Sequence, residues 1–258
     1  MKGNYLAKAA VDLACYDILG KAVSLPVYYL LGGLLREGIP LAWSLGADTP
    51  ENNAREALEY KARGIKTLMI KVGSLSLEED IERVKVVRKA VGKDVHLIVD
   101  ANQGWDIAEV IQFGKAVSKY NIDFIEQPVP YWDIEGLSKI RRSISIPISA
   151  DESLFTIHEA RTLIKKSAVD VFSIKVVKHG GIYKAKQIIE LANAFNIKCW
   201  MNSMIEEGIT QAASLHLGVS TLNILESMGH AYFSPLRLKE DITDYSEQIQ
   251  PQMAVKAF

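Results

Sequence analysis

The sequence predicts an α/β protein of the (β/α) barrel class, with eight parallel strands. Short apolar, β-branched runs alternate with longer amphipathic stretches over most of the 258 residues, which is typical of a parallel sheet joined by crossover helices. Polar residues near the ends of six successive predicted strands recur every 24 to 29 residues, from Ser44 to Lys175, and further steps of 26 and 25 residues reach Met201 and Glu226. No glycine-rich phosphate turn follows the first strand, although an open doubly wound sheet usually has one. Together these observations favour a barrel.

The elements follow from local patterns in chain order. A helix over Tyr5–Gly20 precedes the barrel, because Ala9, Leu13 and Tyr16 share one face at helical spacing. The segment LPVYYLLGG after it contains a proline and paired glycines, which indicate a turn. The predicted strands are apolar and β-branched: Ile39–Gly46, Thr67–Gly73, His96–Asp100, Phe124–Glu126, Ile146–Asp151, Val169–Lys175, Lys198–Met201 and Asn223–Glu226. The predicted helices have apolar residues at helical spacing: Glu51–Arg63, Leu77–Val91, Ile107–Lys119, Ile134–Arg142, Ile157–Lys166, Ile182–Phe195 and Glu207–Ser220.

Composition and charge disfavour several functional classes. The chain is 48% hydrophobic and 24% charged with a net charge of −1, so nothing points to nucleic acid or an anionic membrane. Cys15 and Cys199 are too few for a disulfide framework. No apolar run suits a signal peptide or a transmembrane helix. We therefore expect a cytoplasmic protein with no nucleic-acid or membrane partner.

Carboxylates end three successive predicted strands: Asp100, Glu126 and Asp151. Active sites of barrels lie at the C-terminal ends of the strands, and adjacent strands are only about 4.8 Å apart. Converging carboxylates repel one another unless a cation neutralises them, and oxygen ligands favour a hard divalent ion, Mg²⁺ first and Mn²⁺ second. A single Asp in such a place is more often a helix N-cap, but three in register predict a metal site.

Two lysines end strands that are four apart in the predicted barrel. Lys71 ends the second strand and Lys175 the sixth, so in a barrel of eight they would face each other across the substrate. A lone lysine in an apolar strand is usually a surface residue whose head group reaches water. Each of these follows an isoleucine in a mostly apolar strand, which favours a pair of general acid/base groups.

With these motifs the chain resembles the enolase superfamily and, within it, the mandelate racemase/muconate lactonizing enzyme group. The resemblance runs from about Tyr5 to Leu238 and is carried by DILGKAVSLPVYYLLGG, IKVG, VDAN, IEQP, ADES, IKVVKHGG and SMIE. It implies a modified (β/α)7β barrel, with Mg²⁺ ligands at Asp100, Glu126 and Asp151. It implies that Lys71 and Lys175 are the acid/base lysines of the muconate lactonizing subgroup. Four more residues match the surroundings of the metal or substrate: Asn102, Gln127, Glu152 and Glu206.

The resemblance implies a Mg²⁺-dependent isomerase (a racemase, epimerase or cycloisomerase) for a small carboxylate substrate. Such an enzyme abstracts the α-proton and gives a metal-stabilised enediolate. Three alternatives stay open at this point. They are a dehydratase on the same site, Schiff-base chemistry at Lys175, and a truncated, catalytically impaired barrel.

The chain departs from the family pattern at two strands. Met69 stands where many relatives have the first lysine of Lys-x-Lys, which leaves the substrate type more open. Near the last strand, Ala231 and Phe233 stand where dipeptide epimerases carry Asp-x-Asp to bind an α-ammonium. An ammonium-bearing dipeptide is therefore disfavoured, and an acylated amino acid, an aromatic acid or an unsaturated diacid is favoured.

A third departure concerns domain organisation. Family members carry an α+β capping domain built from N-terminal and C-terminal segments, and we expect this domain to be absent here. We expect residues 1–38 to form a helix and turn leading into the barrel, residues 39–238 the barrel, and residues 239–258 a C-terminal tail. The resemblance also implies that a homo-oligomer can form.

Overall fold

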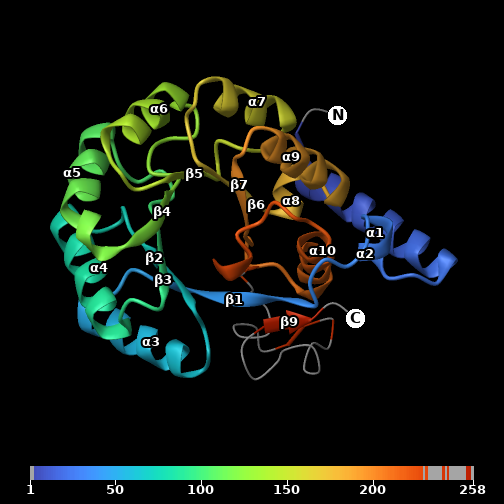
Figure 1. Cartoon of the computed structure of the whole chain (residues 1–258), viewed down its shortest axis with the longest axis horizontal. Coiled ribbons are helices and arrows are strands. Elements are labelled where there is room, and N and C mark those ends of the chain that lie inside the picture. The colour runs from blue at the N-terminus through green and yellow to red at the C-terminus, as the bar shows by residue number, and fades with distance from the viewer. Residues whose placement is uncertain (1–2, 229, 232–239, 242, 244–253, 257–258) are drawn as a thin grey trace. The chain divides into compact units, whose positions relative to one another are not determined.

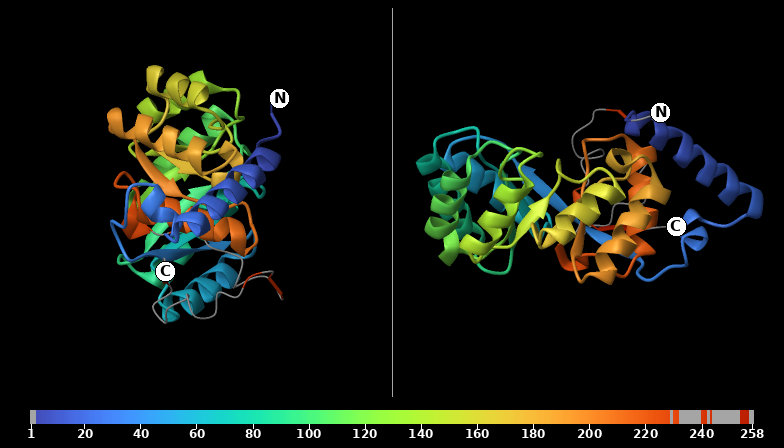
Figure 2. Two further views of the ribbon diagram at one scale, coloured as in Figure 1. Left: turned by 90° about the vertical axis from the view of Figure 1, so that its right-hand side faces the viewer. Right: turned by 90° about the horizontal axis from the view of Figure 1, so that it is seen from above.

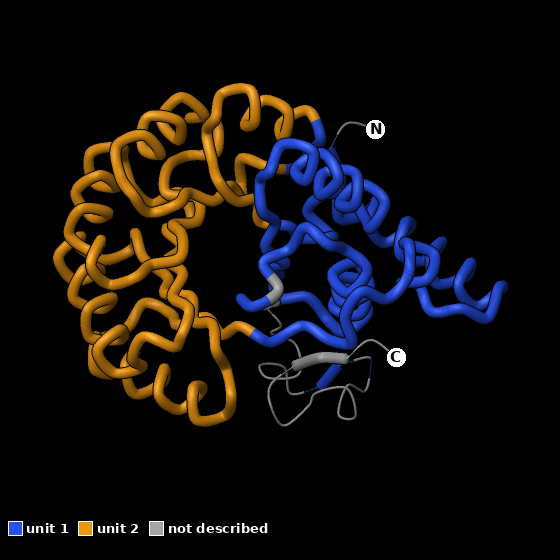
Figure 3. The backbone as a smooth tube through the Cα atoms, in the orientation of Figure 1, with its two compact units in different colours: residues 1–41, 155–157, 174–258 blue, residues 42–154, 158–173 orange. Residues whose placement is uncertain are grey.

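The computed structural model describes residues 3–228, 230–231, 240–241, 243 and 254–256. The chain divides into two compact units (Figure 3). Unit 1 comprises Met1–Leu41, Phe155–Ile157 and Ile174–Phe258, and unit 2 comprises Ala42–Leu154 and His158–Ser173. Within the described ranges, no helix is both long and apolar enough to cross a lipid bilayer.

Unit 2 is built on a parallel sheet whose outer side is covered by helices (Figure 1). Its strands pair in chain order: β1 (Gly38–Leu45, from Ala42 in this unit), β2 (Thr67–Lys71), β3 (His96–Asp100), β4 (Ile122–Glu126), β5 (Ile148–Ala150) and β6 (Val171–Ile174, to Ser173 in this unit). Their side chains are almost entirely buried, as expected for a parallel sheet.

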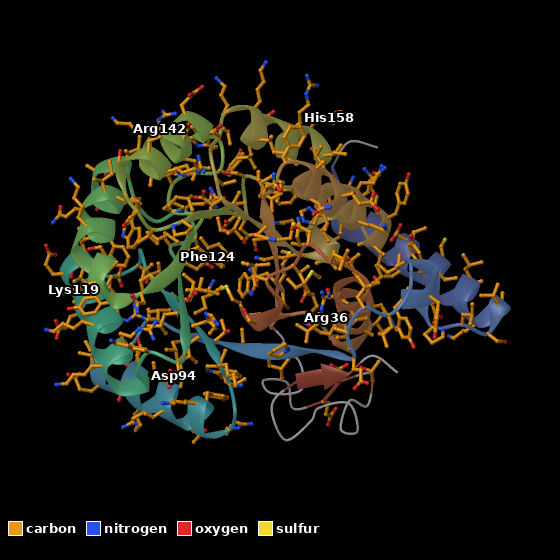
Figure 4. All side chains as sticks on the ribbon, in the orientation of Figure 1. Arg36, Asp94, Lys119, Phe124, Arg142 and His158 are labelled. Carbon is orange, nitrogen blue, oxygen red and sulfur yellow. The ribbon has the colours of Figure 1, made fainter. Side chains whose placement is uncertain are left out.

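Five longer helices join these strands: α3 (Pro50–Ala62), α4 (Leu77–Val91), α5 (Ile107–Val117), α6 (Ile134–Ser143) and α7 (Ile157–Lys165). A short 3₁₀ helix, η1 (Ser118–Tyr120), follows α5. Capping boxes start α4 and α5, where Ser76 and Asp106 exchange hydrogen bonds with the glutamates three residues later. Charged side chains such as Lys119 and Arg142 lie on the outer rim (Figure 4).

Unit 1 contains the N-terminal and C-terminal parts of the chain. Its helices are α1 (Tyr5–Val23), α2 (Val27–Leu30), α8 (Val176–His179), α9 (Ile182–Ala194), α10 (Gly208–Val219) and the 3₁₀ helix η2 (Glu226–Met228). Its strands are β7 (Lys198–Met201), β8 (His230–Ala231) and β9 (Ala254–Lys256), and β9 pairs antiparallel with the first residues of β1.

The long helix α1, dark blue in Figure 2, contacts α9, which lies far along the chain. Asp12 Oδ2 accepts a hydrogen bond of 3.4 Å from the backbone N–H of Tyr183, in the first turn of α9. Gly181, at φ +121°, lets the two segments approach, because a Cβ there would collide with the Asp12 carboxylate. Large apolar side chains of α1 remain exposed, among them Val11 and Ile18.

The first seven predicted strands are confirmed with shifts at their ends, and the eighth is wrong. Predicted strand Ile146–Asp151 is shortened to β5 because Pro147 has no N–H for the ladder. At Asn223–Glu226, Ile224 forms one isolated parallel bridge with Cys199, and η2 begins at Glu226. The Asn223 side chain donates to Ile197 O at 2.8 Å.

Candidate active site

Three buried carboxylates gather at one end of the sheet of unit 2. Asp100 ends β3 and Glu126 ends β4, and the two residues are paired in register. Asp151 directly follows β5, two residues beyond Ser149, which pairs with Glu126. Asp100, Glu126 and Asp151 are 1%, 0% and 2% exposed. Because carboxyl ends of parallel strands meet at one edge, negative charge is concentrated in a poorly solvated place.

Lys71 brings its amine to this cluster from β2. It is paired in register with Asp100, and its Nζ lies 2.5 Å from Asp100 Oδ2. The same Nζ donates to Asn102 Oδ1 at 2.9 Å. The Lys71 side chain is 36% exposed, so its amine is held by polar partners while still accessible to solvent.

Asn102 links Asp100 to a fourth carboxylate. Its backbone N–H donates to Asp100 Oδ1 at 2.9 Å, and its Nδ2 donates to Glu152 Oε1 at 3.2 Å. The left-handed backbone of Asn102, at φ +43°, is one that asparagine tolerates. Burial raises the pKa of Glu152, as do the neighbouring Asp151 and Asp100 charges, against the Asn102 hydrogen bond.

Two further side chains touch this end of β4. Ser173 Oγ donates to Glu126 Oε1 at 3.2 Å. Gln127, which was expected beside the metal or substrate, is fully buried, and its amide bonds to the backbone N–H groups of Asp151 and Ser153. It therefore contacts the backbone that carries a carboxylate.

Lys175 and Glu206 belong to unit 1. Lys175 directly follows β6 and occupies the N-cap position of α8, and its opposition to Lys71 stays a prediction. The Glu206 carboxylate accepts from Met204 N at 2.8 Å, from Gln211 Nε2 at 2.9 Å and from the Ser203 hydroxyl. These bonds fold the loop between β7 and α10 around Glu206. A role for Glu206 beside substrate also stays a prediction.

A buried arginine that contacts the Lys71 backbone was not among the predicted site residues. The guanidinium of Arg83 donates to four oxygens: Asn53 Oδ1 at 2.7 Å, Asp80 Oδ1 at 2.9 Å, Lys71 O at 2.6 Å and Gly46 O at 2.7 Å. Arg83 thereby joins the ends of β1 and β2. The sequence does indicate this burial, because Asp80 and Arg83 lie on the same face of α4 as the apolar residues Val84 and Val87.

The donor chemistry of the carboxylate cluster fits a hard divalent cation. As the described side chains lie, no group of three His, Cys, Asp or Glu residues is arranged to hold a metal ion. One observation nevertheless fits a bound cation: the buried Oε2 of Glu152 has no hydrogen-bond partner within the described part of the chain. Burial, with the Asp151 and Asp100 charges, raises the pKa of this carboxyl. Carboxylate oxygens are the ligands that Mg²⁺ prefers, so Asp100, Glu126 and Asp151 are suitable donors.

Comparisons with known proteins agree with this arrangement. Residues 52–254 match the family described as enolase C-terminal domain-like, and residues 1–32 match the mandelate racemase/muconate lactonizing enzyme N-terminal domain. The chain is 43% identical over 221 residues to a hydrophobic dipeptide epimerase of Enterococcus faecalis, covering 84% of this chain and 61% of that protein. It is 38% identical over 237 residues to an N-succinyl-L-Arg/Lys racemase of Bacillus cereus, covering 92% and 63%. The chain thus spans about three fifths of the length of these curated relatives.

Solved structures extend the likeness to the fold. The Enterococcus faecalis dipeptide epimerase complexed with Mg and the dipeptide L-Leu-L-Tyr superposes with a TM-score of 0.91 at 36% identity, covering 98% of this chain and 70% of that one. The fold is accordingly of the α/β, modified TIM-barrel type, (β/α)7β, that was predicted. By its motifs, its fold and both family matches, the chain belongs to the enolase superfamily, in the mandelate racemase/muconate lactonizing enzyme group.

Proposed function

We propose that this chain carries the catalytic part of a Mg²⁺-dependent isomerase that removes the α-proton of a carboxylate substrate. The reaction would be a racemisation, an epimerisation or a cycloisomerisation. The observation that carries the proposal is the Lys71 amine, 2.5 Å from the buried Asp100 carboxylate and in register with it. The epimerase and racemase names of the two relatives support the same class of reaction.

The proposed cation would be held by Asp100, Glu126 and Asp151. When bound, it supplies positive charge beside the substrate carboxylate, where negative charge grows as the α-proton leaves. Without such compensation, a second negative charge beside three buried carboxylates would be strongly disfavoured.

Proton transfer is assigned to the lysines. Lys71 takes the α-proton on its Nζ, and the hydrogen bond to Asn102 orients that atom. Arg83 holds the Lys71 carbonyl at 2.6 Å, so the main chain beneath the base is fixed. In the proposal, Lys175 returns a proton to the opposite face of the substrate, which inverts the stereocentre.

The proposed substrates are N-acylated amino acids first, then aromatic acids and unsaturated diacids. The residues that disfavour a dipeptide ammonium are Ala231 and Phe233. Phe233 and the Ala231 side chain lie outside the described residues, so this preference rests on the sequence. The Bacillus cereus racemase, whose name specifies N-succinyl amino acids, supports acylated substrates, and the Enterococcus faecalis epimerase supports dipeptides.

The test is α-proton exchange in D₂O with Mg²⁺, followed by NMR, on a panel of N-succinyl amino acids, dipeptides, aromatic acids and unsaturated diacids. We expect exchange without loss of water and its suppression by a chelator. Lys71→Met should lower the exchange rate about 10²- to 10⁴-fold, as loss of a general base does. Lys85→Met, which removes an exposed lysine paired with Glu82 on α4, is the matched control. Absence of exchange with every acid would refute the proposed function, and release of water would favour a dehydratase.

Location and assembly complete the proposal. A cytoplasmic location is supported by the two free cysteines, Cys15 and Cys199, the first of them exposed. A homo-oligomer is supported by the exposed apolar side chains of α1, such as Val11 and Ile18.

A further inference from the structure

The three carboxylates of the proposed cation site are not held in the same way. Asp100 and Glu126 are strand residues, so the ladder between β3 and β4 sets their positions. Asp151 lies beyond β5, a strand of three residues whose pairing with β6 ends at Ala150. The backbone of Asp151 therefore needs another hydrogen-bond partner if it is to be positioned as accurately as Asp100 and Glu126.

That partner is the side-chain amide of Gln127. Gln127 Oε1 accepts from the backbone N–H groups of Asp151 and Ser153, both at 3.0 Å. Its Nε2 donates to Val129 O at 2.9 Å and to Ser153 Oγ at 2.8 Å. Every lone pair and proton of this fully buried amide is used, so its orientation is fixed.

Gln127 is itself held from two sides. Its backbone N–H donates to Ser149 O of β5 at 2.9 Å, and its carbonyl accepts from Gln103 N at 2.8 Å. Its φ of +32° is in the left-handed region, where a residue other than glycine is strained. The left-handed turn lies directly after Glu126, at the point where the Gln127 side chain extends to the loop after β5.

We propose that Gln127 is a positioning residue that sets cation affinity by fixing the backbone of Asp151, without touching cation or substrate. This inference rests on the proposed function, because it assumes that Asp151 is a ligand. Residues that orient ligands in this way typically change metal affinity 10- to 100-fold when replaced.

Two substitutions separate positioning from a general structural role. Gln127→Met fills the volume but removes all four hydrogen bonds. Gln127→Glu has the same shape and keeps an acceptor for Asp151 and Ser153, but its second oxygen replaces the amide donor to Val129 O and Ser153 Oγ. The control is Ser138→Ala, which removes a buried hydroxyl bonded to Lys166 O at 2.8 Å.

The measurements are Mn²⁺ affinity of the full chain by electron paramagnetic resonance and the thermal unfolding midpoint of each variant. We expect Gln127→Met to weaken Mn²⁺ binding at least 10-fold, and Gln127→Glu and Ser138→Ala to stay within about threefold of the unaltered chain. If Gln127→Met does not fold, retained affinity of Gln127→Glu supports the inference and its loss overturns it.

Three other outcomes distinguish the inference from the proposed function. Equal affinity of Gln127→Met and the unaltered chain overturns the role of Gln127 and leaves the cation site intact. Affinity that falls in proportion to stability in all three variants also overturns it. Absence of Mn²⁺ binding by the unaltered chain overturns the proposed cation site, and this inference with it.

Discussion

Replacing Arg83 by Met should destabilise the protein far more than removing an exposed ion pair from the same helix. Arg83 and Asp80 are both 0% exposed, with Nη1 and Oδ1 2.9 Å apart. Without Arg83, Asp80 is a buried charge whose remaining partner is the Gly73 N–H at 2.7 Å. Breaking a buried pair in this way costs about 3–5 kcal/mol. That is a large part of the roughly 5–15 kcal/mol by which domains are usually stable.

The assay is urea unfolding followed by circular dichroism. Lys85→Met is the control, because Lys85 and Glu82 have the same three-residue spacing on α4 but are 49% and 47% exposed; its cost should be below about 1 kcal/mol. In Asp80→Asn/Arg83→Met no charge is left buried, so the double variant should lose less than the sum of the single variants. A loss below about 1 kcal/mol for Arg83→Met, or strict additivity in the double variant, would refute the reasoning.

Three further predictions concern stability. Asp12→Ala, which removes the acceptor for Tyr183 N at the start of α9, should cost about 1 kcal/mol in thermal unfolding, and Asp12→Asn should retain most of that stability. Burial lowers the pKa of His216, so the unfolded chain binds the proton at higher pH, near 6.5. Stability should therefore fall as pH drops below about 6.5, and urea titrations of His216→Phe should show a smaller loss. Gly104→Ala would place a Cβ 2.5 Å from Gly73 O, and calorimetry should reveal a loss of about 1–3 kcal/mol; an unchanged midpoint would contradict the steric argument.

The parts of the candidate site that could be predicted are those set by strand periodicity. Lys71, Asp100 and Glu126 each end an apolar run, and parallel register brings such residues to one edge. Asp151 could be predicted for the same reason, although its strand ends one residue earlier. Strand periodicity therefore predicts the position of a residue along its strand.

Contacts that depend on loop geometry could not be predicted. Gln127 turns its amide toward the next loop because its backbone is left-handed, and strand alternation gives no sign of this. Glu206 bonds within its own loop for a similar reason. The burial of Arg83 was not predicted because a charged residue in a helix is usually assigned to the solvated face. Here a cluster of hydrogen-bond acceptors makes that burial favourable.

The bond between Asp12 and Tyr183 joins residues 171 positions apart, which has a consequence for synthesis of the chain. Translation adds about 5–20 residues per second, so α1 leaves the ribosome roughly 10–30 s before its anchoring N–H exists. Throughout that interval α1, whose Ala9 and Leu13 are buried in the folded protein, has neither α8 nor α9 to pack against. Helix α1 is thus secured only after the much later α9 has been made, and nascent chains that end before Tyr183 should depend most on chaperones that cover apolar surface.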